Sequence, residues 1–186
     1  MIAPAAAARV KLVVLDVDGV MTDAGYYLGD VDGKPSELLR YDIQDGVGIV
    51  LLRMAGLKVA IITGRESESV RLRAAQLKVD ALAQDKRARK VAALTRITAE
   101  LGVAMDEVAF LGDDLPDLAP FRLVGMPVAV ANAVPEIREA AQVHLTKQGG
   151  HGAIREFAEA LLRARGDWTA LVERYVADRM STELPA

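Results

Sequence analysis

The chain has 186 residues, no cysteine, two histidines, and a net charge of −3 from 23 basic and 26 acidic side chains. A chain of this length can bury the core of one domain without disulfide bonds, and the lack of cysteine excludes a disulfide framework, a thiolate zinc site and a cysteine nucleophile. The absence of a basic excess argues against a protein that binds nucleic-acid phosphates. No apolar run approaches the roughly 20 residues of a membrane span, so we expect a cytoplasmic protein.

Strands and helices are predicted in alternation along most of the chain. Residues 1–9 are small and apolar but lack the basic start of a signal peptide, so we interpret them as a disordered leader. Continuous apolar runs, typical of parallel strands covered on both faces, span residues 10–15, 57–63, 108–112 and 126–130. Helical spacing of apolar residues occurs at about residues 45–55, 66–77, 88–102, 114–123, 135–141 and 152–165. The alternation predicts one α/β domain over residues 10–165, with a doubly wound, Rossmann-like parallel sheet.

Two segments lie outside this alternation. Residues 24–42 hold two aromatic and aliphatic arms around Asp32 and Gly33, which is a hairpin signal. Residues 166–186 form a C-terminal tail with Asp167 as a plausible helix N-cap. Helical spacing in this tail relates Trp168, Leu171, Val172, Tyr175 and Val176. Such an apolar stripe can pack on its own domain or on a neighbouring subunit, and the sequence favours neither.

The tetrapeptide Asp-Val-Asp-Gly occurs twice, at residues 16–19 and 30–33. The first copy follows the buried strand of residues 10–15, which would aim both carboxylates at the end of the sheet. The second copy lies inside the predicted hairpin, where aspartate and glycine serve turn geometry. We therefore predict that the first copy carries chemistry and that the second shapes a turn.

Further polar residues lie where the other predicted strands end. They are Thr63 at the end of the second strand, Asp113, Asp114 and Asp117 after the third, and Lys90 at the start of the helix between them. Ligands of open α/β sheets bind at the carboxyl ends of the strands, so these groups should converge with the first Asp-x-Asp pair. Each has a structural alternative as a helix cap, a turn or a solvated lysine, but the combination favours a site.

The residue types fit phosphoryl transfer. Carboxylates are ligands suited to Mg²⁺, and an aspartate can attack phosphorus to form an aspartyl-phosphate. A lysine, a hydroxyl and a cation would surround the negative charge of the transferring group. A second carboxylate would give a proton to the leaving alkoxide and later take one from water.

A family resemblance follows from these motifs. The segments "DVDGVMTD", "IITGR", Lys90 and "GDDLPD" resemble the four motifs of haloacid dehalogenase-superfamily phosphatases. Longer segments across residues 10–165, including "VRLRAAQLKVDALAQ" and "GGHGAIREFAEALL", resemble the small 3-deoxy-D-manno-octulosonate (KDO) 8-phosphate phosphatases. The resemblance implies a haloacid dehalogenase-like core with a protruding hairpin, no large cap domain, and Mg²⁺-dependent hydrolysis of a keto-sugar acid phosphate, with KDO 8-phosphate from lipopolysaccharide biosynthesis as the leading substrate.

The resemblance also implies roles for the residues at the strand ends. Asp16 would be the nucleophile and a Mg²⁺ ligand, and Asp18 the general acid/base with its backbone carbonyl on the metal. Asp113 would be the remaining side-chain metal ligand. Thr63 and Lys90 would hold the phosphoryl oxygens. Just outside, orienting Lys90 or metal-bound water, would lie Asp114 and Asp117.

The implied substrate contacts and assembly concern other segments. Gly64, Arg65 and Arg155 would face the sugar acid, because a guanidinium suits a carboxylate and a glycine permits close backbone approach. Members of this kind are typically homotetramers in which the hairpin of residues 24–42 contributes to assembly and a neighbouring subunit covers the active site.

The sequence departs from the family pattern in the loop "AQDKRARK", which is one residue longer and makes Lys86 a rival to Lys90. Asn132 replaces a common aspartate and should only shape a loop, and the glycine of "TDAGYY" is shifted by one place. His144 is interpreted as structural and His151 as a surface residue of a glycine-rich loop.

Three alternatives remain beside the leading function. Close relatives act on nine-carbon acids, such as KDN or N-acylneuraminate 9-phosphate. A catalytically silent oligomerisation domain is a second alternative, although every required side chain is present. A receiver-like regulatory module also uses Mg²⁺ and an aspartyl-phosphate, but it places its acidic groups in a different order along the chain.

Overall fold

The computed structural model describes residues 1–180, and its centre is a six-stranded sheet in the order β5-β4-β1-β6-β7-β8. All neighbouring strands of this sheet run parallel. The strands are β1 (Leu12–Leu15), β4 (Lys58–Thr63), β5 (Ala81–Gln84), β6 (Val108–Gly112), β7 (Met126–Ala129) and β8 (Val143–His144). The predicted doubly wound α/β fold is confirmed.

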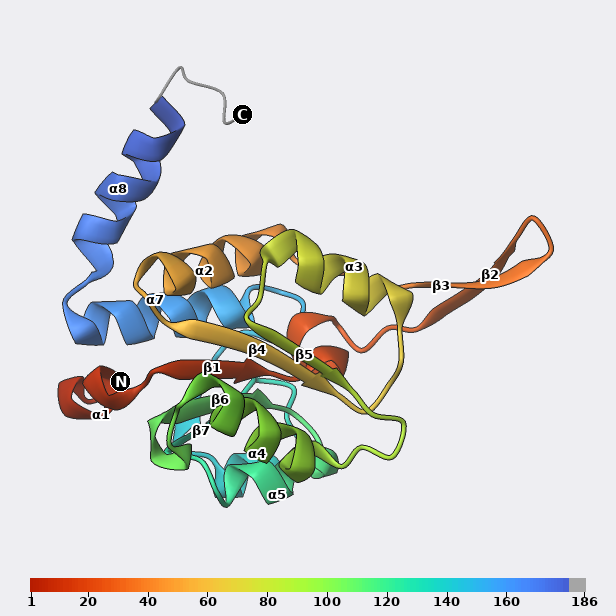
Figure 1. The fold of residues 1–186 in the computed structure, drawn as a ribbon, viewed down its shortest axis with the longest axis horizontal. Helices are drawn as coiled ribbons and strands as arrows, with labels where there is room; N and C mark the ends of the chain where they lie inside the picture. Colours follow the sequence, from red (N-terminus) through yellow and green to blue (C-terminus); the bar gives the residue numbers. More distant parts are fainter. Residues whose placement is uncertain (181–186) are drawn as a thin grey trace.

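Helices cover both faces of the sheet (Figure 1). On one side lie α2 (Ile43–Met54), α3 (Glu68–Leu77) and α7 (Ala153–Arg165), and on the other α4 (Lys90–Leu101) and α5 (Leu118–Phe121), while α6 (Pro135–Ala140) precedes β8. Every residue of β1 and β6 is buried, which explains why these strands are continuous apolar runs. The central strands therefore end at fixed positions inside a rigid core.

The N-terminal segment differs from the expected disordered leader. It forms the helix α1 (Pro4–Arg9), which begins with proline at its first position and continues in alanine, a strong helix former. The side chain of Ala7 is buried, and Arg165 of α7 donates hydrogen bonds to the carbonyls of Ala7 (3.3 Å) and Val10 (3.1 Å). Contact with α7 thus orders a segment too short to be a stable helix on its own.

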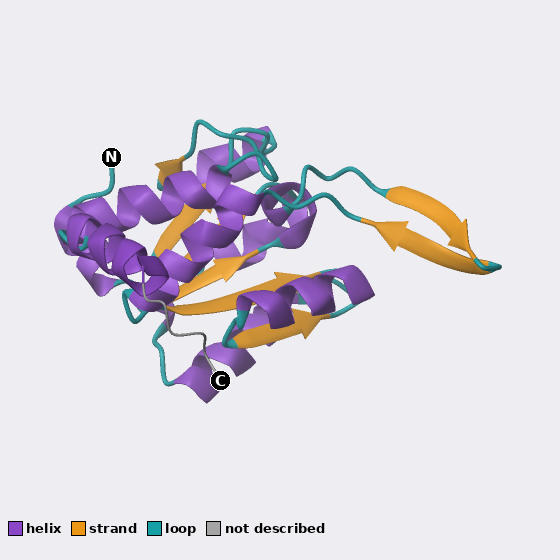
Figure 2. Ribbon diagram, turned by 90° about the horizontal axis from the view of Figure 1, so that it is seen from above, coloured by secondary structure: helices purple, strands orange, loops and turns teal. Residues whose placement is uncertain are grey.

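The hairpin is confirmed and consists of β2 (Tyr27–Val31) and β3 (Lys34–Leu38), which extend away from the domain (Figure 2). Asp32 and Gly33 both have positive φ, of 54° and 76°, as a two-residue hairpin turn of type I′ requires. The backbone N–H of Gly33 donates to Asp30 Oδ1 at 2.8 Å. The second Asp-Val-Asp-Gly is therefore turn structure. Large apolar side chains of the hairpin are exposed, namely Tyr27, Leu28, Val31 and Leu38.

The predicted C-terminal helix is α8 (Trp168–Met180), which leaves the body of the domain at an angle to α7 (Figure 1). Leu171 is its one buried residue within the described part of the chain. The carboxylate of Asp167 accepts a hydrogen bond from Arg165 (2.9 Å), and its backbone carbonyl accepts one from the N–H of Leu171 (3.0 Å). Residues 181–186 of the predicted tail lie outside the described residues. Among helices within residues 1–180, none is both long and apolar enough to cross a membrane.

Candidate active site

The first strand delivers Asp16 to the end of the sheet. The backbone N–H of Asp16 continues the parallel pairing by donating to the carbonyl of Leu111 on β6, at 3.1 Å. The chain then turns sharply through residues 17–21, where Gly19 has φ of +85°. A Cβ atom on Gly19 would lie 2.0 Å from Oδ2 of Asp113, so this close approach requires glycine. The turn brings the loops after β1 and β6 into contact.

Lys90 lies between two carboxylates. Its Nζ is 2.8 Å from Asp16 Oδ1 and 2.6 Å from Asp117 Oδ1, and all three side chains are almost fully buried. Burial raises the pKa of Asp16 well above its ordinary value, the charge of Asp117 adds to this, and Lys90 opposes it. Burial also lowers the pKa of Lys90, but the two carboxylates more than offset this effect and hold it above its ordinary value. The lysine is therefore a fixed positive charge beside Asp16.

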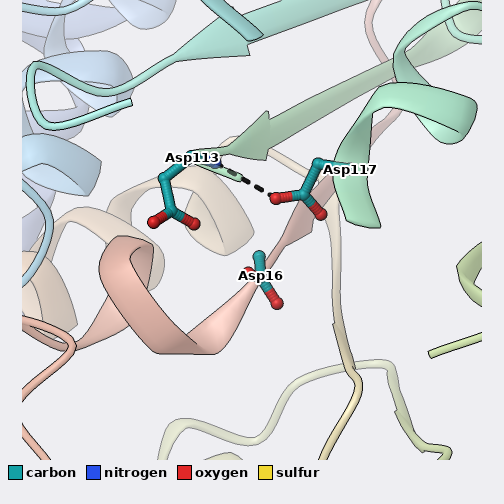
Figure 3. A group of neighbouring side chains, drawn as sticks. All are labelled: Asp16, Asp113 and Asp117. Carbon is teal, nitrogen blue, oxygen red and sulfur yellow. Dashed lines mark hydrogen bonds between the residues drawn. The ribbon is translucent and has the colours of Figure 1, made fainter. Parts of the chain in front are cut away.

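Asp16, Asp113 and Asp117 face one another, each with a carboxylate oxygen within 4.8 Å of the others (Figure 3). Asp117 has both oxygens engaged, because Oδ1 accepts from Lys90 and Oδ2 accepts from the backbone N–H of Asp113 at 3.1 Å. In contrast, Oδ1 of Asp113 is buried without a hydrogen-bond partner among residues 1–180. Burial, followed by the charge of Asp117, raises the pKa of Asp113 to about 7. Asp16 and Asp113 thus fit a divalent cation, whereas Asp117 serves the lysine and the loop.

A cavity of about 330 Å³ opens in front of these groups. Thr63 is buried at its wall, and its Oγ1 accepts the backbone N–H of Arg65 at 3.3 Å. Asp18 is half-buried, with Oδ2 3.1 Å from Nε of Arg65. Burial raises the pKa of Asp18, and the charge of Arg65 opposes this. The lining residues are Asp16, Asp18, Ala24, Thr63, Gly64, Arg65, Ala88, Lys90, Asp113, Asp114 and Pro116.

Comparison with known proteins identifies the family. Residues 83–157 match the family model of the haloacid dehalogenase-like hydrolases. A 3-deoxy-D-manno-octulosonate 8-phosphate phosphatase of Escherichia coli K12 is 38% identical over 162 residues, which cover 87% of this chain and 84% of the relative. The chain belongs to the KDO 8-phosphate phosphatase family of haloacid dehalogenase-like hydrolases.

Solved structures of family members match the whole architecture. The phosphatase of Moraxella catarrhalis, crystallised with a magnesium ion, a phosphate ion and KDO, has a TM-score of 0.87 and 34% identity, and the match covers 92% of this chain and 97% of that one. The cobalt-bound phosphatase of Haemophilus influenzae has a TM-score of 0.79 and 33% identity, covering 87% of this chain and 92% of that one. The predicted family resemblance is therefore confirmed.

The structure of this KDO 8-phosphate phosphatase family member does not bring Arg155 into the cavity. The Arg155 guanidinium lies over the ring of Trp168, 5.3 Å from its centre, because α8 presents this aromatic face to α7. Lys86 also lies elsewhere, since it forms an exposed ion pair with Glu66 at 2.8 Å. Of the two rival lysines, only Lys90 reaches the carboxylates.

The remaining predicted positions have local roles. Asp114 lines the cavity and also caps the 3₁₀ turn Leu115–Asp117, accepting the N–H of Leu115 at 2.8 Å. His144 lies on β8 with Nε2 2.8 Å from the carbonyl of Arg138. His151 lies 3.3 Å from Arg40 at the surface.

Two residues that the sequence analysis did not assign to the site hold backbone segments next to it. Asn132 donates to the carbonyl of Gly19 (2.9 Å) and accepts the N–H of Gly149 (2.7 Å), so it ties the turn after β1 to the glycine-rich loop. Asp45 of α2 is buried and accepts the backbone N–H groups of Gly152 (3.3 Å) and Arg155 (2.8 Å) at the start of α7. Burial raises the pKa of Asp45 to about 6. The only local signal for Asp45 was a carboxylate on the apolar side of a helical pattern.

Proposed function

We propose that this protein is a Mg²⁺-dependent phosphomonoesterase that hydrolyses KDO 8-phosphate to KDO and phosphate through an aspartyl-phosphate. The observation that carries the proposal is the buried Asp16, which lies beside Lys90 and near the unpartnered oxygen of Asp113. These groups stand at the wall of a cavity that several charged residues line. The names of the Escherichia coli relative and of the Moraxella catarrhalis complex support the substrate and the metal.

The proposed reaction has two displacements. A carboxylate oxygen of Asp16 attacks phosphorus, and the bond to the sugar oxygen breaks as Asp18 gives that oxygen a proton. Asp18 then takes a proton from water, the water oxygen attacks phosphorus, and the bond to Asp16 breaks to release phosphate. The Lys90 ammonium and the Thr63 hydroxyl hold phosphoryl oxygens throughout.

Asp16 and Asp113, with the backbone carbonyl of Asp18, would hold the magnesium ion. When bound, it neutralises phosphoryl charge and helps to keep Asp16 ionised. Asp117 keeps Lys90 in place through the 2.6 Å contact. Gly64 lies at the wall of the cavity, where a Cβ would stand 3.1 Å from Cβ of Ala88 and narrow the entrance.

We also propose a cytoplasmic homotetramer in which a neighbouring subunit covers the cavity. The exposed apolar side chains of β2 and β3 support it, because an isolated two-stranded hairpin is only marginally stable in water. Size-exclusion chromatography with light scattering tests this assembly, and a monomer at assay concentrations would contradict it.

Phosphate release from KDO 8-phosphate and from an aryl phosphate, with and without Mg²⁺, tests the proposed activity. Asp16→Asn should abolish release, and Lys90→Ala should lower kcat by at least about a hundredfold, the scale on which charge-stabilising groups act. Lys86→Ala, the matched lysine outside the cavity, should keep wild-type rates. A panel that ranks nine-carbon acid phosphates above KDO 8-phosphate by kcat/KM would reassign the substrate, and no release from any phosphate would favour the silent domain.

A further inference from the structure

Arg65 is held on several sides at the mouth of the cavity. Its Nε is 3.1 Å from Asp18 Oδ2, and its guanidinium carbon lies 4.2 Å from the centre of the Tyr26 ring. Its Nη2 is 3.6 Å from Oε2 of Glu37, and this nitrogen is buried with no hydrogen-bond partner in the described chain. The side chain is therefore fixed in place, with Nη2 enclosed beside Glu37.

Glu37 reaches this position from the hairpin. It lies on β3, a strand whose residues are exposed or only partly buried, yet its own side chain is only 20% exposed. Its second oxygen, Oε1, accepts a hydrogen bond from the hydroxyl of Ser67. Ser67 is the N-cap of α3 and also donates its backbone N–H to Gln84 on β5, at 2.5 Å. Glu37 thus connects the base of the hairpin to the framework next to the cavity.

The contacts between Glu37 and Arg65 add little to the stability of the fold. An ion pair between partly exposed groups contributes little to stability, and the hairpin has no buried side chain whose packing needs Glu37. An arginine has many rotamers, however, and a guanidinium fixed by a carboxylate and an aromatic face loses less entropy when it binds a ligand. The contacts of Glu37 therefore make most sense as preorganisation of Arg65.

We infer that Glu37 is a positioning residue, which together with Tyr26 orients the Arg65 guanidinium to receive the carboxylate of a sugar acid. The inference rests on the proposed function, because it gives Arg65 a carboxylate-bearing substrate. Glu37 touches neither the phosphoryl group nor the nucleophile, and it is linked to the general acid Asp18 through Arg65. Its main effect should therefore be on recognition of the sugar acid.

The variant Glu37→Gln tests this inference, because glutamine keeps an oxygen for the Ser67 hydroxyl and removes the charge that faces Arg65. We expect kcat/KM for KDO 8-phosphate to fall about tenfold, the effect of one charge-assisted interaction, mainly through KM. With an aryl phosphate, which lacks the carboxylate, kcat/KM should stay within about twofold of wild type, because the changed group does not act on the reacting phosphate. Glu66→Gln is the matched control, since Glu66 neighbours Arg65 in sequence but pairs with Lys86.

A double-mutant cycle makes the coupling to Arg65 explicit. In an Arg65→Ala background, Glu37→Gln should have no further effect on KDO 8-phosphate turnover, because the side chain that it positions is gone. Equal losses with both substrates, an unchanged rate with KDO 8-phosphate, or the same loss in the Arg65→Ala background would each overturn the inference. If the wild type releases phosphate from neither substrate, both the proposed function and the inference fail. If the wild type is active but Glu37→Gln keeps the wild-type ratio of kcat/KM for KDO 8-phosphate to that for the aryl phosphate, the inference alone is refuted.

Discussion

The buried carboxylate of Asp45 makes a defined contribution to the pH dependence of stability. Burial raises its pKa in the folded protein from an ordinary value of 3.8 to about 6. Between these values the folded protein holds a proton that the unfolded chain has lost, so the free energy of unfolding falls as the pH rises through this range. At about 1.4 kcal/mol for each pH unit, the whole window corresponds to about 3 kcal/mol.

Asp45→Asn removes the titration but keeps a side-chain oxygen for the N–H of Arg155. Integration of the proton linkage from pH 5 to pH 7.5 gives about 1.4 kcal/mol. The wild type should therefore lose about 1.4 kcal/mol more stability than Asp45→Asn over this interval. Other buried carboxylates contribute to both proteins alike and cancel in the comparison.

Urea denaturation at pH 5 and pH 7.5, in EDTA, measures the change in the free energy of unfolding between these pH values for the wild type and for Asp45→Asn. Asp178→Asn is the control, because Asp178 is exposed on α8 and its replacement should leave the wild-type pH dependence unchanged. Equal pH dependence in the wild type and Asp45→Asn would refute the reasoning. It would mean that the two backbone N–H groups at the start of α7 stabilise the Asp45 carboxylate as strongly as burial destabilises it.

Three further predictions follow from individual contacts. A double Asp30→Asn, Asp32→Asn variant should keep kcat within about twofold, because both residues only shape the hairpin turn; a loss as large as that of Asp16→Asn would contradict this assignment. Gly19→Ala should lower the free energy of unfolding by at least about 1–2 kcal/mol, because position 19 has a left-handed backbone that alanine disfavours. It should also weaken Mg²⁺ binding, measured by calorimetry, by displacing the Asp113 carboxylate; an unchanged Mg²⁺ affinity would show that the clash is relieved elsewhere. Asn132→Ala should lower the urea unfolding free energy by about 2 kcal/mol, about one for each lost hydrogen bond, and a neutral result would mean that water replaces both.

The central fold could be predicted from the sequence because both faces of the sheet are covered. Strands β1, β4, β6 and β7 consequently are apolar along almost their whole length. The edge strands were not predicted. Strand β5 is mostly only partly buried and two of its four residues are alanine, and β8 has two residues, so neither carries a hydrophobic pattern of its own. Helix α1 depends on its contact with α7, which local sequence does not reveal.

The convergence of the polar residues was predictable for a related reason. Asp16 and Asp113 follow buried parallel strands and Thr63 ends another, and the register of these strands fixes where they end. The direction of a long side chain is not fixed in this way, and Arg155 turns to Trp168, which lies in another helix. Glu37 reaches Ser67 across 30 residues of sequence, and no periodic pattern reports such a contact.

The charges on the cavity wall bear on the order in which a cation and a phosphate ester would bind. The lining includes four carboxylates and two cationic groups, so with every carboxylate ionised its formal charge is −2, equal and opposite to the charge of one divalent cation. A phosphate ester dianion approaching the metal-free wall meets net repulsion in a partly desolvated space, where charges interact strongly. With a divalent cation bound, the wall would be formally neutral, and Lys90 and Arg65 could attract the anion. We therefore expect the cation to bind before the ester, and the chelated protein to bind inorganic phosphate weakly.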